Sequence, residues 1–384
     1  MSVTCHLCER PLIDPVIVAT EARTGHLCTV ACRSCSLVQT SPHPSEAEVS
    51  EYYASGDYRR EFPPLPVEGL SEALEPTGAT VEPTDREYEV ALDRHAQHAA
   101  RRLVGMGVVE VAMSRVVEVG CGDGRVASAL QSLGVRVEVV EQDPTMRARA
   151  AARGLTVHAS IGDVSGRADV ALALQVVEHF ADPVGGLVAI AGMADRVYVE
   201  VPTVERPYVS IAHFFQRAHA VTYSQHTLTA ALKRAGFGSV HTAMDGSVLC
   251  AIGTREREAQ PYEPHGGPSA EEVVGTLHAW ERDRVAKAKA GSIVARFEAC
   301  ESLTAEERSF MADEWIRWRS MAVDAASSLA SIVRQLEEAE RPDWHPDAWV
   351  RGYYAGRIYE GQRAGIMLGH ALNSLATNLN RSKA

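Results

Sequence analysis

The segment 116–125, VVEVGCGDGR, has the residue types of a ligand-binding loop. A run of β-branched apolar residues ends at three closely spaced glycines, Gly120, Gly122 and Gly124. They stand between a predicted strand and a predicted helix, so backbone N–H groups at the start of the helix would face a ligand. In a dinucleotide fingerprint the third glycine comes one residue later, and no Gly-Lys-Ser/Thr follows as in a P-loop. The loop therefore predicts a nucleotide-like ligand without identifying it.

Carboxylates near the ends of predicted strands narrow the class of ligand. Glu118 precedes the loop on its strand, and Glu141 ends the next strand, 21 residues after Gly120. A carboxylate in that place can accept both hydroxyls of a ribose. Asp163 follows the third strand, where it could meet the amino group of an adenine. Taken singly, Glu118 could be an edge carboxylate and Asp163 a helix N-cap, but together they favour a ligand that contains a nucleoside.

A second group of reactive residues lies at the N-terminus. Cys5-x2-Cys8 and Cys32-x2-Cys35 are two pairs separated by 23 residues. Such pairs suit a tetrahedral structural zinc with four thiolate ligands, and Cys28 is a fifth candidate that could replace one of them. The alternative is reduced cysteines without a metal. A closed site of four thiolates leaves no open position, so its predicted role is in folding.

The central part of the chain alternates β-rich runs with helical patterns, which is typical of a parallel sheet covered on both faces. Two further apolar runs, near 238–243 and 247–252, leave no room for a helix between them and predict an antiparallel hairpin at the sheet edge. We therefore expect an α/β fold with a doubly wound, Rossmann-like sheet. The five expected parallel strands are 115–119, 135–141, 156–160, 168–174 and 196–201.

Composition divides the chain into four predicted regions. These are a zinc-binding module (1–45), a linker and helical lid (46–110), a ligand-binding α/β domain (111–256) and a helical domain (257–384). The sequences SAEE (269–272) and TAEE (304–307) both fit the capping-box pattern and predict helix starts. Glycines recur at i+4 in the last predicted helix, which indicates close helix–helix contact. The helical domain is thus expected to be a lid or to mediate homo-oligomer formation.

Charge and hydropathy exclude several classes of protein. The formal net charge of the 384 residues is −12, which disfavours a surface that tracks nucleic-acid phosphates. No apolar stretch reaches the length of a membrane span. The N-terminus has no apolar core of a secretory signal. We therefore expect a cytoplasmic protein with no nucleic-acid or membrane partner.

The ordered motifs VVEVGCGDG, VEQDP, IGDV and LQVVEHFADP closely resemble the motif series of class I S-adenosylmethionine-dependent methyltransferases. The resemblance covers about 111–256 and includes the edge hairpin. It implies that the glycine loop wraps the methionine part of the cofactor, that the second strand end takes the ribose, that two segments frame the adenine, and that the fourth strand end lies near the sulfonium. In that order the residues are Gly120, Gly122 and Gly124, then Glu141, then Gln142, Asp163 and Val164, and finally Gln175. By the same resemblance, Glu118 helps to orient the glycine loop or binds the amino group of the cofactor through water.

The N-terminal 60 residues resemble the zinc-binding segment of sugar C-methyltransferases from antibiotic pathways. The matching features are C-x-x-C-x-L-V, Pro-x-Pro-Ser and a pair of tyrosines. In those enzymes a Glu-His pair followed by Tyr-Phe-Ser stands after the fifth strand, and that histidine is thought to act as a base. Here His219 matches the histidine and Tyr223 the phenylalanine, while Ala218 and Thr222 replace the glutamate and the tyrosine. The C-terminal helices also depart from the second α/β domain of those enzymes, which loosens the C-methylation hypothesis.

Taken together, the motifs predict methyl transfer from S-adenosylmethionine to a small-molecule biosynthetic intermediate, such as a sugar or a specialised metabolite. The cofactors expected are S-adenosylmethionine and a structural zinc. His219 is the expected base, with Tyr223, His179 and His213 as further catalytic candidates in the histidine- and tyrosine-rich part of the crevice. The alternatives are an RNA or protein methyltransferase that uses the zinc module for recognition, a non-catalytic cofactor-binding scaffold, and a nucleotide oxidoreductase.

Overall fold

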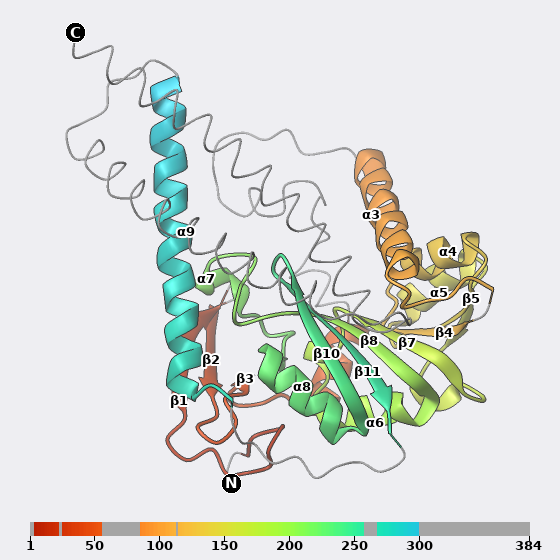
Figure 1. The fold of residues 1–384 in the computed structure, drawn as a ribbon, viewed down its shortest axis with the longest axis horizontal. Helices are drawn as coiled ribbons and strands as arrows, with labels where there is room; N and C mark the ends of the chain where they lie inside the picture. The colour runs from red at the N-terminus through yellow and green to blue at the C-terminus, as the bar shows by residue number, and fades with distance from the viewer. Residues whose placement is uncertain (1–3, 23–24, 56–84, 113, 257–266, 299–384) are drawn as a thin grey trace, which may run out of the picture. The chain divides into compact units, whose positions relative to one another are not determined.

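The computed structural model describes residues 4–22, 25–55, 85–112, 114–256 and 267–298 (Figure 1). The chain forms two compact units, 1–282 and 283–384. The predicted linker at 63–83, the capping box at 304–307 and the glycine-rich last helix lie outside the described residues. The division into four regions therefore stays a prediction.

A seven-stranded mixed sheet forms the centre of the first unit, in the order β10-β11-β8-β7-β4-β5-β6 (Figure 1). The strands β8, β7, β4, β5 and β6 are parallel neighbours, and β11 pairs antiparallel with both β8 and β10. This confirms the doubly wound sheet and its edge hairpin. The strand bounds are β4 (Arg115–Val119), β5 (Arg136–Val140), β6 (Thr156–His158), β7 (Ala168–Leu174), β8 (Ala194–Pro202), β10 (Phe237–Asp245) and β11 (Val248–Arg255).

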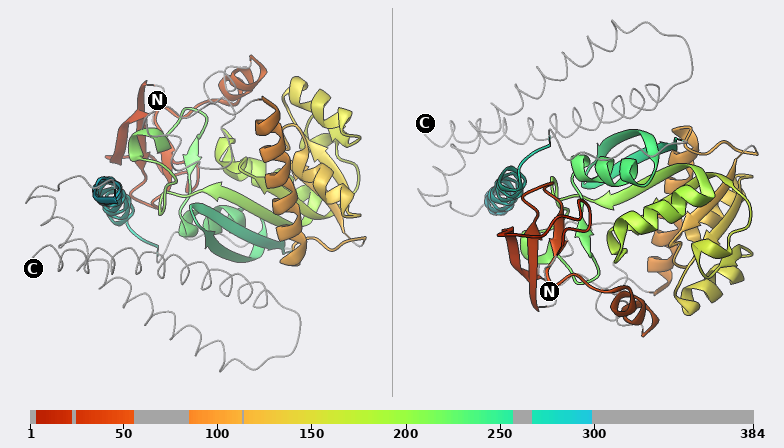
Figure 2. Two further views of the ribbon diagram at one scale, coloured as in Figure 1. Left: turned by 90° about the horizontal axis from the view of Figure 1, so that it is seen from above. Right: turned by 90° about the horizontal axis from the view of Figure 1, so that it is seen from below.

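Helices cover both faces of this sheet (Figure 2). On β4, Val116 packs with the helices of one face, while Val117 and Val119 pack with those of the other, as the period of two in a strand requires. Such near-continuous burial of β-branched residues is the pattern of a parallel sheet between two helix layers. One face carries α3 (Asp85–Gly105), α4 (Arg125–Ser132) and α5 (Pro144–Ala152); the other carries α6 (Pro183–Met193) and α8 (Gln225–Arg234).

The sheet order reverses direction between β4 and β7. The chain runs outward through β4, β5 and β6, then returns to place β7 on the other side of β4 and β8 beyond it. The connections that follow β4 and β7 thus leave the sheet on opposite faces. In such sheets ligands bind in the crevice at the carboxyl ends of the strands, at this switch point. The glycine loop follows β4 and lies there.

The N-terminal module, residues 4–45, is built around a second, four-stranded antiparallel sheet. Its order is β1-β2-β3-β9, and its fourth strand comes from the connection that follows β8. The module also shares a hydrophobic cluster with α6 and α8 through Leu7 and Leu37. It is therefore joined to the connection after β8 by strand pairing and to the helices of the larger sheet by packing. The strands are β1 (Val16–Ala22), β2 (Gly25–Ala31), β3 (Val38–Thr40) and β9 (Val221–Thr222).

Two further helices both begin with a capping box. Helix α1 (Glu46–Ala54) begins at Ser45 with a capping box formed with Glu48. Helix α9 (Ala270–Glu298) begins after Ser269, whose side chain and backbone N–H exchange hydrogen bonds with Glu272, as the SAEE motif predicts. Its first turns pack against β1 and β3. Among the described helices, none is long and apolar enough to cross a membrane.

A substitution at Gly124 tests how tightly the loop after β4 is packed. Its φ is +77°, and an added Cβ would lie 2.5 Å from Leu155 Cδ1 and 3.0 Å from Ala150 Cβ. We expect Gly124→Ala to lower the free energy of unfolding by roughly 2–4 kcal/mol, from left-handed strain and overpacking. Gly154→Ala is the matched control, because its φ is +81° with nothing within 4 Å. Urea unfolding of both variants measures the difference, and equal losses would contradict the packing argument.

Candidate active site at the carboxyl ends of the strands

The glycine loop is fixed by hydrogen bonds between the ends of β4 and β5. Gly120, Gly122 and Gly124 all have positive φ, from +56° to +77°, which side chains other than glycine rarely adopt. The Gly120 N–H donates to Val140 O (2.8 Å), and the Gly122 N–H donates to Glu141 Oε2 (2.8 Å). Glu141 Oε1 accepts from the Asp143 N–H at 2.9 Å. The predicted ribose-binding carboxylate is thus held in place by backbone donors beside the loop.

Glu118 lies inside the sheet beneath this loop. It is buried, and its Oε2 has no hydrogen-bond partner among the described residues. Burial, together with the charges of Asp123 and Glu141, raises the pKa of Glu118 to about 8. A buried carboxyl without full hydrogen bonding is costly when ionised. It is therefore suited to meet a cationic or hydrogen-bonding group that enters the loop.

The other predicted cofactor residues lie at the same edge of the sheet. Gln142 is the second residue after β5 and is exposed, while Asp163 ends the 3-10 turn η1 (Ile161–Asp163) after β6 and Val164 is its C-cap. Asp163 Oδ2 accepts from the backbone N–H and hydroxyl of Ser160, so Ser160 is the N-cap of the turn and Asp163 is the third residue of its capping box. Gln175 follows β7 with an exposed side chain and a φ of +56°. Such a strained residue is often found at a functional site.

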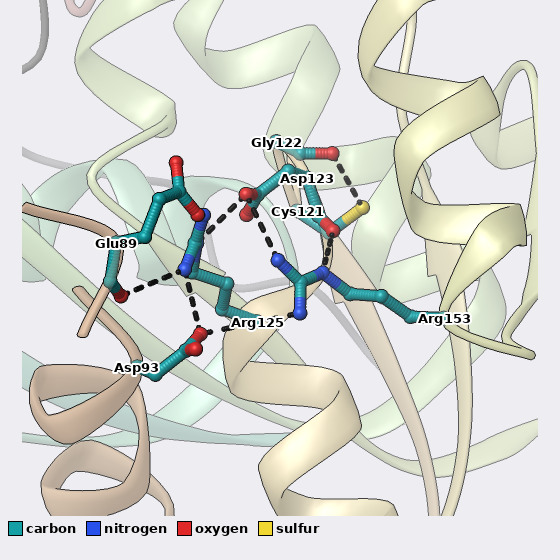
Figure 3. Close-up of polar contacts among 7 residues, drawn as sticks. All are labelled: Glu89, Asp93, Cys121, Gly122, Asp123, Arg125 and Arg153. Atoms are coloured by element: carbon teal, nitrogen blue, oxygen red, sulfur yellow. Dashed lines mark hydrogen bonds and ion pairs between the residues drawn. The ribbon is translucent and has the colours of Figure 1, made fainter. Parts of the chain in front are cut away.

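Two arginines clamp the loop to helices on either side, as Figure 3 shows. Arg125 Nε donates to Asp123 (2.7 Å), and its guanidinium also bonds Glu89 and Asp93 of α3. Arg153, after α5, donates from Nε to Asp123 O at 2.9 Å. An arginine at a helix N-terminus is unfavourable by itself, and here the three carboxylates offset that cost.

Neither arginine was singled out as a site residue from the sequence. The signal that could have found Arg125 is Glu89 with Asp93, an acidic i, i+4 pair on a predicted helix, together with an Asp-x-Arg sequence in the loop.

A second arginine cluster holds the other end of α3. Arg102 donates to Glu200 of β8 and, at 2.7 Å, to Asp245 Oδ2 at the end of β10. The buried Tyr198 hydroxyl donates to the same Glu200 carboxylate (2.8 Å). Helix α3 is therefore anchored to the glycine loop at one end and to the sheet and its edge hairpin at the other.

The histidines predicted for catalysis come together next to Gln175. His179 ends the 3-10 turn η2 (Val177–His179), and His219 precedes β9 by two residues. Their rings meet edge to face with centroids 4.8 Å apart. Tyr53 of α1 places its hydroxyl 2.7 Å from His179 Nδ1. Three segments far apart in the sequence thus build one cluster at the carboxyl edge of the sheet.

The chemical state of this cluster follows from its burial. His219 is buried, and burial with the neighbouring His179 lowers its pKa well below the usual value, so the imidazole is neutral. Tyr223 is fully buried; burial raises its pKa, and its hydroxyl has no hydrogen-bond partner among the described residues. His213 lies apart on α7 (Ile211–Phe214), exposed and bonded to Ser210 Oγ (2.7 Å). The structure therefore groups His179, His219 and Tyr53, and leaves His213 outside.

The two cysteine pairs form one cluster in the N-terminal module. The Sγ atoms of Cys5, Cys8, Cys32 and Cys35 lie within 4.8 Å of one another, with 3.5 Å for Cys5–Cys35 and 3.8 Å for Cys8–Cys32. Four sulfurs around a zinc at about 2.3 Å would be about 3.8 Å apart. These four thiols fit a structural zinc, and Cys28 is not among the grouped ligands.

Comparison with known proteins agrees with this architecture. Residues 72–242, fewer than half of the chain, match a family model described as a methyltransferase domain. No curated protein sequence matches the chain. The matched residues include most of the Rossmann-like sheet: the match begins before α3 and ends within β10.

The solved structures that are similar to this chain are distant from it in sequence. Magnesium protoporphyrin IX methyltransferase from Synechocystis PCC 6803 with bound SAM is 15% identical, with a TM-score of 0.37; the match covers 54% of this chain and 95% of that one. A SAM-dependent methyltransferase from Archaeoglobus fulgidus is 14% identical (TM-score 0.37; 44% and 100% covered). The N-terminal domain of EvdMO1 with SAH bound is 18% identical (TM-score 0.34; 48% and 94% covered). What those proteins bind is a property of those proteins.

The cysteine cluster predicts a metal content that depends on four of the five N-terminal cysteines. We expect Cys8→Ser to lower the zinc content by one ion per chain relative to the unmodified protein and to lower the Tm, since metal binding supplies folding free energy. Cys28→Ser is the control and should keep both. Elemental analysis and thermal unfolding measure the two quantities. Equal zinc content in all three proteins would refute the four-thiolate assignment.

The buried Glu118 predicts a pH dependence of stability. Its pKa rises from the usual 4.5 to about 8 on folding, so between these values the folded state binds more protons and stability falls as pH rises. We expect Glu118→Gln, which stays neutral, to gain on the order of 5 kcal/mol over the unmodified protein between pH 4.5 and 8, at about 1.4 kcal/mol per pKa unit. Urea unfolding at several pH values measures this gain. If the free energy of unfolding of the two proteins changes with pH in the same way, Glu118 is not buried in its neutral form.

Proposed function

We propose that the protein transfers a methyl group from S-adenosylmethionine to a small-molecule acceptor. The observation that carries the proposal is the hydrogen-bonded unit of left-handed glycines and Glu141 at the switch point of the sheet. A nucleoside that lies across this edge meets backbone N–H groups from the loop and a fixed carboxylate from β5.

The charge around the loop favours this cofactor over a dinucleotide. Glu118, Asp123 and Glu141 bring carboxyl groups to the loop, while Arg125 and Arg153 are both engaged with carboxylates. A pyrophosphate would thus meet acidic groups and no unengaged arginine here. S-Adenosylmethionine has a sulfonium and an ammonium group and no phosphate, so it suits an acidic surrounding.

Each predicted cofactor residue then has a role by its place along the edge. The glycines surround the methionine part, with Glu118 beneath them for the amino group. Glu141 accepts from the ribose hydroxyls, and Gln175 lies near the sulfonium at the end of β7. Gln142, Asp163 and Val164 frame the adenine at the ends of β5 and β6.

The acceptor would lie between Gln175 and the histidine cluster. In-line transfer requires the accepting atom and the methyl group to be aligned, and fixing that alignment is the main contribution of the protein. We assign deprotonation of the acceptor to the cluster of His179 and His219, with Tyr223 beside it. The acidic chain favours a small metabolite, such as a sugar or a specialised metabolite, over nucleic acid.

Titration with S-adenosylhomocysteine tests this function. We expect the unmodified protein to bind it, and Glu141→Ala and Asp163→Ala each to weaken binding, for Glu141→Ala by roughly 10–100-fold, as for loss of a hydrogen bond to a charged group. Asp195→Ala removes an exposed carboxylate at the amino end of β8 and is the control that should leave affinity unchanged. Isothermal titration calorimetry measures all four proteins, with NAD as the competing ligand. Binding of NAD instead, or unchanged affinity in both variants, would overturn the proposal.

A further inference from the structure

We infer that Glu178, His179 and His219 form a binding site for a divalent transition-metal ion, separate from the cysteine cluster. One carboxylate oxygen and one ring nitrogen from each histidine lie within 4.8 Å of one another. Glu178 and His179 are adjacent in η2, and His219 comes from the connection before β9. The site therefore exists only once β7 and the segment that joins the N-terminal sheet have come together.

The separations among the three side chains suit ligands of one ion better than hydrogen-bonded partners. The Gln216 amide nitrogen lies 2.6 Å from His219 Nε2, so metal binding at that nitrogen requires the amide to turn away. His179 Nε2 is 3.8 Å from Glu178 Oε1, too far for a hydrogen bond. Two atoms that each lie about 2.0–2.1 Å from an ion can be up to about 4.2 Å apart. Closing the whole set around an ion needs movements of less than about 1 Å, which side-chain rotation supplies.

The state of Glu178 is the second, independent observation. Its side chain is 1% exposed, and neither carboxylate oxygen has a hydrogen-bond partner among the described residues. Buried carboxylates in proteins are paired with a cation, bound to a metal or protonated. Burial does raise the pKa of Glu178, to about 8. Because two imidazoles lie close to the Glu178 carboxylate, binding of a metal ion is favoured over protonation. Glu118 is also buried, but among the described residues it belongs to no such group of metal-binding side chains.

The contacts of His179 prepare one of its nitrogens for a metal. Its Nδ1 lies 2.8 Å from Ala218 O, and a carbonyl oxygen can only accept, so the proton is on Nδ1. The hydroxyl oxygen of Tyr53 lies 2.7 Å from the same nitrogen. The lone pair is then on Nε2, which is the nitrogen nearer Glu178. Histidines that bind metals usually donate their other N–H to a carbonyl in this way.

The ligand types select the class of ion. Two imidazoles and one carboxylate suit first-row transition metals such as zinc, iron, cobalt or manganese, and disfavour magnesium and calcium, which prefer oxygen ligands. Three protein ligands leave positions for water or for another molecule. If the proposed function holds, a hydroxyl of the acceptor can take such a position, and the ion would favour its anion. The histidine cluster would then assist deprotonation through the ion that it holds, with the proton passing to solvent, and not through a free imidazole lone pair. The binding of the metal itself does not rest on that function.

Titration of the 384-residue protein by Co²⁺ alone, after its cysteine cluster has been loaded with zinc, tests the inference. We expect one Co²⁺ per chain to bind with ligand-field absorption in the visible and no thiolate charge-transfer band, which separates this site from the four cysteines. Glu178→Gln, which keeps the side-chain volume, and His219→Ala should each weaken the affinity at least tenfold. His213→Ala should leave it unchanged, and Mg²⁺ should not displace the Co²⁺.

Two outcomes would overturn the inference: no Co²⁺ bound outside the cysteine cluster, or equal affinities in Glu178→Gln and the unmodified protein. Circular dichroism and the Tm show whether each variant is folded. If His219→Ala does not fold, Glu178→Gln by itself still tests the site. Because no cofactor is present, failure here leaves the proposed methyl transfer intact. Failure of S-adenosylhomocysteine to bind would likewise leave the Co²⁺ result intact.

Discussion

The hydrogen bond from the Gly122 N–H to the Glu141 carboxylate joins the ends of two neighbouring strands, and the rest of the site depends on it. It forms only because the loop after β4 adopts left-handed backbone at three glycines, which turns a backbone donor toward β5. The loop then closes over the buried Glu118. A side chain at Gly120 would meet Val176, which leads into η2, so the same turn also sets the distance to the histidine cluster.

Helix α3 is held beside the glycine loop by ion pairs at two places along its length. Arg125 ties its first half to the loop, and Arg102 ties its last turn to β8 and the edge hairpin. Because both arginines meet more than one carboxylate, removing either would leave acidic groups facing one another. The acidic character of the loop is thus balanced by arginines that are engaged in structure, and the ligand-facing surface keeps its carboxylates.

The N-terminal module also helps to position the residues of the site. Strand β9 pairs with β3 and comes directly after the segment that carries His219. A cysteine cluster that fits a structural zinc orders the loops on either side of β1 and β2, and β3 then fixes β9. Folding of a module far away in sequence thereby positions a histidine at the carboxyl edge of the larger sheet, beside Glu178 and His179.

The sequence by itself determined the parallel strands, the edge hairpin, the glycine loop and the cysteine spacing, because each is encoded within a short window by periodicity, by backbone freedom or by ligand spacing. It also indicated Glu141 and His219. Tertiary structure alone decided that Arg125 and Arg102 hold α3, that β9 joins the N-terminal sheet, and that Glu178 is buried beside two histidines. These features depend on contacts between distant segments, which no local pattern of residues records.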